Sequence, residues 1–162
     1  MKGGSSLTAS ADEMIFSLDL QAPLEGVLAL HRSLGILVKI TCAANHPQLL
    51  AVQLFTPTEL TLLLPLLESY PDYCPYEVCY ARFHGATSDR EVTRAREMLY
   101  TAMGTEEWEI IMRPMRNVLS RIRLKLRTLD LEVRTLLETG YLLAPRKQKR
   151  EPEGTRDGGK QQ

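Results

Sequence analysis

The sequence has few of the features that mark secreted or membrane-spanning proteins. Only three of its 162 residues are cysteines, which cannot all pair, so a disulfide framework is excluded. The longest apolar stretch, Leu62–Leu67, is interrupted by a proline and is far shorter than the roughly 20 residues that a transmembrane helix needs. The first residues carry one lysine and no long apolar run behind it, so no secretory signal is visible. We therefore expect a soluble, cytoplasmic protein.

Sequence patterns of common catalytic or metal sites are also missing. The chain has no Gly-rich phosphate loop, no nucleophile elbow and no HExxH string. Cys74, Cys79 and His84 follow one another at intervals of five, but zinc sites usually begin with a closer cysteine pair, and no fourth ligand is evident. The three glutamates within residues 106–109 are typical of a helix start, where the helix dipole favours acids. The sequence thus favours a protein that is not an enzyme and binds no metal or cofactor.

The composition is that of an ordinary globular domain with an uneven charge distribution. Hydrophobic residues make up 44% and charged residues 25% of the chain, which is long enough to bury one modest core. The net charge is zero, yet residues 1–112 carry 7 basic and 14 acidic side chains, whereas residues 113–150 carry 11 basic and 3 acidic ones. A block this basic beside an acidic body predicts a face that binds a polyanion.

The N-terminal part of the chain predicts a small antiparallel sheet. Residues 14–20 alternate as in a strand, and residues 36–43 and 49–54 resemble two paired strands with turn residues between them. Residues from Pro23 to Gly35 have apolar side chains at helical spacing, which predicts a helix. Residues 1–11 are small and polar and predict a disordered lead-in.

The rest of the chain predicts helices and a terminal hairpin. A helix should begin at Thr56, because Thr56 and Glu59 can form a capping box with Pro57 in the first turn, and should run to about Ser69 with a kink at Pro65. Further helices are expected over 75–83, from Ser88 to Gly104, from an acidic start at 105–109, and from about Pro114 to Thr128. Two short strands, 132–136 and 140–143, predict a hairpin, followed by a disordered tail over 145–162.

The segment Arg113–Arg127 contains six basic residues and no acidic one. On a helical wheel its apolar residues fall within roughly a third of the circumference, and most of its basic residues gather on the other side. One face can therefore be anchored in a core while the opposite face points outward. The apolar arc consists of Met115, Val118, Leu119, Ile122 and Leu126, and the polar side of Arg113, Arg116, Ser120, Arg123 and Arg127, with Asn117 and Arg121 at its margin.

Two other interpretations of this basic helix stay open. A basic stripe is often just a solvated face, although such faces usually mix both signs and gain ion pairs along the helix. A basic amphipathic helix can also bind anionic lipid, but this apolar arc lacks aromatic residues. The absence of acids over this segment favours a phosphate backbone as the neutralising partner, with the helix in the major groove of DNA.

Three segments of the chain resemble the OmpR/PhoB-type winged-helix domain of bacterial response regulators. The stretch from Leu54 to Leu66, with Thr-Pro-Thr-Glu followed by leucines, is similar to the family's opening "LTPTE…LL". Residues Ser120–Leu126, which read SRIRLKL, are similar to its recognition helix "SRLRKKL". Residues Val133–Leu143, with Val-Arg-Thr and then Gly-Tyr, are similar to its wing "IRTVRGVGYRL". The three strings occur in the family's order, and the resemblance spans about residues 36–144.

The resemblance implies an α+β fold: a winged helix-turn-helix with an N-terminal antiparallel sheet and a C-terminal β-hairpin wing. It implies a transcriptional regulator that binds double-stranded DNA sequence-specifically, with the helix Arg113–Arg127 in the major groove and the hairpin beside the minor groove. The residues that it places at the DNA are Arg113, Asn117, Ser120, Arg121 and Arg123 on the helix and Arg134, Thr135 and Tyr141 at the wing. The helical wheel, rather than the family, adds Arg116 and Arg127.

The chain departs from this family in three places. We expect no receiver domain, because only about 35 residues precede the first paired strands and they lack an acidic phosphorylation pocket. Residues 12–35 are expected to be an N-terminal extension of one strand and one helix. Residues 86–112 form an insertion at the position of a short family loop that contacts RNA polymerase or orients the recognition helix. The insertion replaces that loop, so the resemblance offers RNA polymerase only as a candidate partner. Because the family often binds tandem or inverted half-sites, a homodimer on DNA is a second candidate. Glu138 stands at the wing tip, where it would repel phosphate.

The alternative function is a winged helix used as a protein–protein interaction module without DNA binding.

Overall fold

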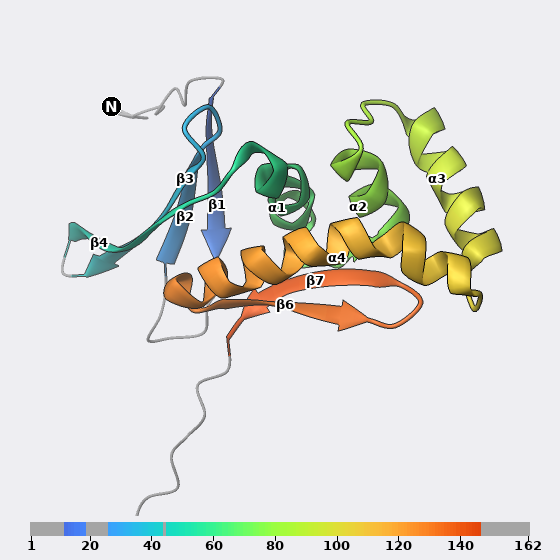
Figure 1. Ribbon diagram of the computed structural model, residues 1–162. Helices are drawn as coiled ribbons and strands as arrows, with labels where there is room; N and C mark the ends of the chain where they lie inside the picture. The colour runs from blue at the N-terminus through green and yellow to red at the C-terminus, as the bar shows by residue number, and fades with distance from the viewer. Residues whose placement is uncertain (1–11, 19–25, 44, 147–162) are drawn as a thin grey trace, which may run out of the picture.

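A four-stranded antiparallel sheet forms the N-terminal part of the fold (Figure 1). The computed structural model describes residues 12–18, 26–43 and 45–146, so the predicted lead-in over 1–11 and the tail beyond residue 146 lie outside the described residues. The strands lie in sequence order and comprise β1 (Glu13–Leu18), β2 (Gly26–His31), β3 (Ile36–Ala43) and β4 (His46–Leu54).

The helix predicted from Pro23 to Gly35 is wrong for its described part, because Gly26–His31 is strand β2. Leu28 and Leu30 are completely buried on one face of the sheet, and β1 and β3 hydrogen-bond to the two edges of β2. The apolar residues of this segment fit the two-residue repeat of a strand as well as the repeat of a helix. Hydrogen bonding to β1 and β3 on the two sides selects the strand. Residues 19–25 lie outside the described residues.

Helices follow the sheet and cover one of its faces. The capping box at Thr56 is confirmed: the Glu59 N–H donates to the Thr56 hydroxyl at 3.2 Å, and the Thr56 N–H donates to the Glu59 carboxylate at 3.0 Å. The predicted helix beginning at Ser88 is also confirmed, with the same kind of cap. The helices are α1 (Pro57–Ser69), α2 (Tyr76–Phe83), α3 (Asp89–Ala102) and α4 (Glu106–Leu126), and α4 continues into a short 3₁₀ turn, η1 (Arg127–Leu129).

The expected break before Pro114 does not occur, since α4 is one continuous helix and Pro114 lies in its interior. A proline here removes the hydrogen bond to the carbonyl of Ile110, four residues earlier. Both residues lie on the exposed face of α4, where water can satisfy that carbonyl, and the burial of the opposite face offsets the missing bond. The consequence is that the acidic residues 106–109 and the basic residues after them share one helix.

The chain ends in the predicted hairpin, which belongs to a second sheet. Its strands are β6 (Leu131–Leu136) and β7 (Gly140–Pro145), slightly longer than expected, and the two-residue strand β5 (Cys74–Pro75) pairs with β7. A side chain at Gly140 would come within 2.1 Å of the Cys74 carbonyl oxygen, so this pairing requires a glycine. A strand of two residues has no periodicity by which the sequence could reveal it.

One hydrophobic core joins both sheets to the helices. Along α4, Met112, Met115, Ile122 and Leu126 are fully buried, and Val118 and Leu119 are nearly so, which confirms the predicted apolar arc. These side chains meet the inner face of the four-stranded sheet, α1 and the hairpin in the same cluster. The opposite face of α4 therefore points away from the core.

Lys39 is the largest polar side chain inside this core. It lies on the inner face of β3 with 1% of its surface exposed, and its Nζ donates a hydrogen bond of 3.2 Å to the Leu129 carbonyl. The same ammonium lies 3.6 Å from the Asp130 carboxylate, which is half exposed. Lys39 thus connects the sheet to the C-terminal end of α4, while its aliphatic stem packs among apolar side chains.

Replacing Lys39 should separate the contributions of its stem and its charge. Lys39→Ala is expected to lower the free energy of unfolding by about 2–4 kcal/mol, because it leaves a cavity in the core. Lys39→Met keeps the stem and removes only the polar contacts, so the expected decrease is about 1–2 kcal/mol. Urea unfolding measures both, and equal decreases would show that the stem contributes nothing.

Candidate nucleic-acid interface

The outward face of α4 carries a ridge of polar side chains, Arg113, Asn117 and Arg121, which we call the α4 ridge. The three residues are spaced by four, so they lie above one another over about 12 Å of helix. All three are exposed, and within the described ranges none of them forms a hydrogen bond or an ion pair with another residue. Three of the predicted DNA contacts are therefore brought together and left available to a partner.

Two other predicted arginines are held by carboxylates. Arg116 pairs with Glu109 at 2.5 Å, two turns earlier on α4, and Arg134 pairs with Glu132 at 2.5 Å on the same strand. All four side chains are at least one third exposed, and exposed pairs of this kind are worth at most about 1 kcal/mol. Phosphate can therefore compete with the carboxylates for these arginines. The sequence predicts that both arginines face DNA, but in the structure each is already paired with a glutamate.

Arg123 connects α4 to the hairpin. Its Nε donates to the Val133 carbonyl at 3.2 Å, and its Nη2 donates to the Thr135 hydroxyl at 2.8 Å. Arg123 and Thr135 were both predicted to face DNA, but in the structure they contact each other. Their effect is to hold the hairpin alongside the helix, as Figure 1 shows.

The remaining predicted residues differ in exposure. Arg127 is exposed at the C-terminal end of α4 and, among the described residues, has no ion-pair partner. The Ser120 hydroxyl donates to the Arg116 carbonyl on its own helix at 3.0 Å. Tyr141 is only 3% exposed, and its ring packs edge-on against Tyr76 with 5.1 Å between centroids. Burial raises the pKa of the Tyr141 hydroxyl, and the expectation of a surface contact there is wrong, because this tyrosine is a core residue.

Acidic residues mark the other end of the same surface. Glu106, Glu107 and Glu109 are exposed on the first turn of α4, where the helix dipole favours them. Glu138 is exposed in the tight turn of the hairpin, with a left-handed φ of 58°. In Figure 1 this turn lies toward the N-terminal half of α4. The basic part of the surface therefore begins at Arg113, one turn after Glu109, and continues to Arg127.

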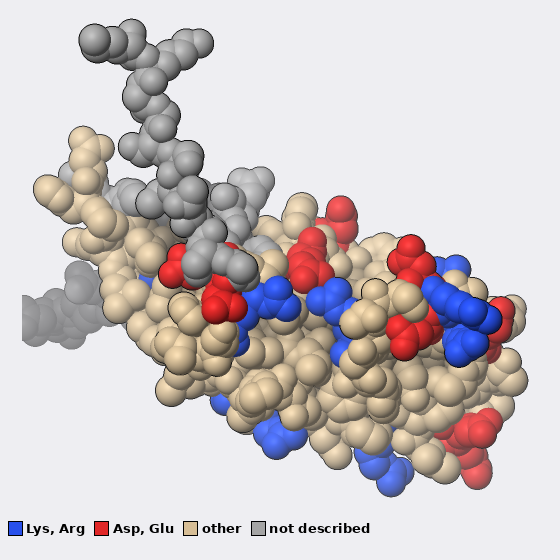
Figure 2. Space-filling view, turned by 90° about the horizontal axis from the view of Figure 1, so that it is seen from above, with Lys and Arg blue, Asp and Glu red and all other residues tan. Residues whose placement is uncertain are grey.

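Helix α3 leaves the α4 ridge uncovered. Helix α3 packs against α2 and contacts α4 near the N-terminal end of α4. There Glu107 and Ile111 of α4 line a hollow together with Arg94 and Met98 of α3. Figure 1 shows α3 at the far end of α4, away from η1. On the face over α1 to α3, basic and acidic side chains alternate (Figure 2), in keeping with the pairs Arg82–Glu68 and Arg96–Glu77.

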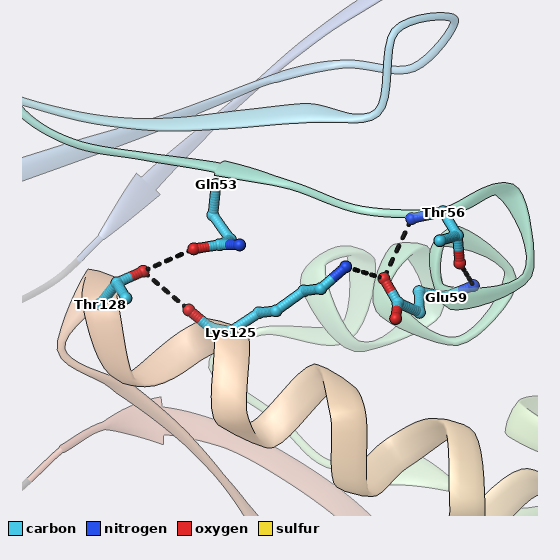
Figure 3. A network of polar contacts seen from close by, with 5 residues as sticks. All are labelled: Gln53, Thr56, Glu59, Lys125 and Thr128. Atoms are coloured by element: carbon cyan, nitrogen blue, oxygen red, sulfur yellow. Dashed lines mark hydrogen bonds and ion pairs between the residues drawn. The ribbon is translucent and has the colours of Figure 1, made fainter.

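A polar network that sequence reasoning missed fixes the position of the basic half of α4 (Figure 3). The Glu59 side chain is only 3% exposed, and it accepts a hydrogen bond of 2.6 Å from the Lys125 ammonium as well as the capping bond from Thr56. Burial raises the pKa of this carboxyl, but the Lys125 bond, the Thr56 N–H and nearby Arg121 outweigh it, so the net pKa is lowered. The sequence identified Glu59 as a cap, but nothing in it pointed to Lys125, 66 residues away.

Two further contacts strengthen this junction. Lys125 lies 5.4 Å from the centre of the Phe55 ring, within range of a cation–π interaction. The Thr128 hydroxyl contacts the Gln53 side chain at 3.2 Å and donates to the Lys125 carbonyl at 2.8 Å. These contacts connect the end of β4, the start of α1 and the end of α4 to one another.

The other candidate features do not form a site. Among the described residues, no three histidine, cysteine, aspartate or glutamate side chains are arranged to hold a metal ion. Cys74 and Cys79 are buried thiols, with the Cys79 Sγ 3.9 Å from the Cys74 carbonyl oxygen. His84 packs against the ring of Tyr80 with the two rings tilted by 48°. None of the helices in the described ranges is long and apolar enough to cross a lipid bilayer.

Comparison of the chain with protein-family models, with curated proteins and with solved structures finds no match.

The lowered pKa of Glu59 predicts how stability depends on pH. A carboxyl with a lowered pKa stabilises the fold above its unfolded pKa and loses that contribution as the pH falls through its folded pKa. Glu59→Gln keeps an acceptor for the Thr56 N–H and removes the charge, so the expected decrease in stability at neutral pH is about 1–3 kcal/mol.

The difference between wild type and Glu59→Gln should shrink as the pH falls toward 3, measured by urea unfolding at each pH. Glu68→Gln, which removes an exposed partner of Arg82, is the control and should cost less than 1 kcal/mol. A Glu59→Gln difference that stays constant down to pH 3 would contradict the assignment.

Proposed function

We propose that the chain binds double-stranded DNA through the α4 ridge, with the β6–β7 hairpin as the wing of a winged helix. The observation that carries the proposal is the ridge itself: two arginines and an asparagine on successive turns, exposed and without partners in the described part of the chain. The order of elements supports the same proposal, since a capped helix, a short helix, a basic helix and a hairpin follow an antiparallel sheet.

The side chains of the α4 ridge have the chemistry that the major groove requires. Arginine donates two hydrogen bonds to the O6 and N7 of guanine, and asparagine makes the equivalent pair with adenine. The ridge covers about 12 Å, or three to four base-pair steps. Arg127 lies near its C-terminal end, and Arg116 on its flank can exchange Glu109 for a phosphate. The function proposed on this basis is that of a sequence-specific transcriptional regulator.

The acidic residues limit how the helix can approach DNA. Glu106, Glu107 and Glu109 would meet phosphates if α4 entered the groove by its N-terminus, and Glu138 would do so at the wing tip. We therefore place α4 from Arg113 onward in the groove and assign the hairpin a supporting role, through the contacts of Arg123 with Val133 and Thr135.

A protein–protein interaction module is the second candidate, and two exposed side chains favour it. Ile110 and Leu124 lie on the same outward face as the ridge, 65% and 59% exposed. Aliphatic side chains in this position add nothing to phosphate binding, whereas a protein partner would bury them. This candidate predicts that binding depends on Ile110 and Leu124 and changes little with salt.

Removing the two ridge arginines should weaken DNA binding strongly and leave the fold intact. Arg113→Ala with Arg121→Ala removes two exposed cations that no described residue pairs with. The slope of log affinity against log salt should become shallower by about 0.9 for each phosphate that the variant no longer neutralises, and affinity at low salt should fall by at least about 100-fold. Fluorescence anisotropy measures the salt slope and the affinity, first with a random pool of duplexes and then with the sequences selected from that pool.

Arg90→Ala with Arg94→Ala is the matched control, because it removes the same charge from exposed positions of α3. This control should leave DNA affinity within a few-fold of wild type. It should change the slope of log affinity against log salt less than the ridge substitutions do. Equal effects of the two pairs would show that only total charge matters. A wild-type chain that binds no duplex at low salt would refute DNA binding and leave the protein-interaction candidate.

A further inference from the structure

A large aliphatic side chain, Leu124, stands in the middle of the basic surface of α4. It is 59% exposed, although six other side chains of this helix are buried. At about 100° per residue, Leu124 lies about 20° from both Arg113 and Asn117 on the helical wheel, so it shares the stripe of the α4 ridge. The opposite side of the wheel is the buried arc around Ile122. Leu124 therefore points almost directly away from the core.

The contacts of its two neighbours in the chain fix this direction. Arg123 donates to two oxygen atoms of the hairpin, at 3.2 and 2.8 Å. Lys125 reaches the buried Glu59 carboxylate at the start of α1 (Figure 3). These two side chains leave the helix about 200° apart, with Leu124 midway between them. Rotation of α4 about its axis would break one contact or the other, so the fold holds Leu124 outward.

Two exposed arginines lie one turn before and one turn after Leu124. Arg121 precedes it by three residues and Arg127 follows it by three, and residues three apart are neighbours on the surface of a helix. Both arginines are exposed, and neither forms a hydrogen bond or an ion pair with another described residue. A partner that buries Leu124 therefore has to accept two cations beside an apolar contact.

The major groove of DNA offers this combination of groups. Phosphates flank the groove and accept hydrogen bonds from arginine, and thymine presents a C5-methyl group at the base edges. An apolar protein surface supplies no anion for Arg121 or Arg127, and burying either cation without a partner is strongly unfavourable. The charges around Leu124 therefore favour DNA as the molecule that covers it.

Ile110 is a second exposed aliphatic side chain on this face of α4, and its surroundings are acidic. It is 65% exposed. Glu106 and Glu107 precede it by four and three residues, and both are exposed on the first turn of the helix. Carboxylates at these positions would repel phosphates and keep this turn out of the groove. Ile110 thus resembles Leu124 in size and exposure but lies at the end of α4 that DNA would avoid.

We propose that Leu124 packs against the C5-methyl group of a thymine and so determines one base of the DNA site. This inference rests on the proposed function, since it requires α4 to lie in the major groove. Leu124 lies about 4.5 Å beyond Arg121 along the helix, which places the thymine about one base-pair step beyond the base that Arg121 contacts, on the side away from Arg113. The α4 ridge reads hydrogen-bonding groups, and Leu124 adds recognition of an apolar group that distinguishes thymine from the other bases.

Removing the methyl group from the DNA and the side chain from the protein, separately and together, tests the proposal. The probe is a duplex that the wild-type chain selects from a random pool, with each thymine replaced in turn by deoxyuridine, which keeps the base pair and lacks the methyl group. At one thymine the replacement should weaken wild-type binding about three- to fivefold, as expected for one methyl group in a buried contact. In Leu124→Ala the same replacement should change the affinity by less than about 1.5-fold, because the methyl group has lost its partner.

Further measurements separate this contact from charge and from folding. Leu124→Ala removes no charge, so the slope of log affinity against log salt should stay that of wild type. Its circular dichroism and thermal midpoint should also stay unchanged, because the side chain is exposed. Leu124→Met keeps an apolar side chain at the position and should retain the dependence on the thymine methyl group.

Ile110→Ala is the matched control and should leave both the affinity and the response to deoxyuridine as in wild type. Suppose that the wild-type chain binds duplex through the α4 ridge but responds to no deoxyuridine replacement, or that Leu124→Ala keeps the wild-type response. Either result would overturn the contact of Leu124 and leave the proposed function intact. Equal weakening by Ile110→Ala and Leu124→Ala would also overturn it. A chain that binds no duplex at low salt would overturn both proposals.

Discussion

The arrangement of this molecule depends on the burial of one side of α4. Met112, Met115, Ile122 and Leu126 are completely excluded from solvent, and each such side chain contributes about 1.5–3 kcal/mol relative to an exposed one. Because those residues recur at helical spacing, burying them turns the opposite face outward along the whole helix. Arg113, Asn117 and Arg121 are thus exposed because the opposite face packs in the core. No contact of their own side chains is needed to hold them in that position.

Burial determines which face of α4 is exposed. The charged contacts determine where the C-terminal end of the helix lies in the fold. Lys39 reaches the last carbonyls from the sheet, and Lys125 reaches the buried Glu59 at the start of α1. Both contacts act at the C-terminal end of α4. Exposed ion pairs such as Arg116–Glu109 contribute little to stability, whereas a pair with a buried carboxylate is costly to break. The contacts that anchor α4 thus lie at the same end of the helix as Arg121 and leave that side chain exposed.

The two faces of the N-terminal sheet have different roles. Its inner face supplies Leu28, Leu30 and Leu37 to the core and supports the end of α4, whereas its outer face keeps aliphatic side chains in solvent. An antiparallel sheet with one solvated face ordinarily alternates apolar and polar residues. Strands β3 and β4 depart from this pattern, since their outward residues are aliphatic whereas Lys39 and Gln53 point to the inner face. The fold of a single chain does not explain the exposed aliphatic residues Leu49, Val52 and Leu54 of β4.

Local spacing along the chain was enough to predict the features that depend on near neighbours. The capping box of Thr56 and Glu59, the apolar arc of α4 and the β6–β7 hairpin all follow from spacings of a few residues, and the structure confirms each of them. Tertiary structure decided what depends on distant partners. Gly26–His31 became a strand because two neighbouring strands were there to pair with it, and Arg123 turned to Val133 and Thr135 because the hairpin lies beside it. Helical periodicity shows which side of a helix faces a core, but it holds no information about which atoms from elsewhere in the chain will lie opposite each side chain.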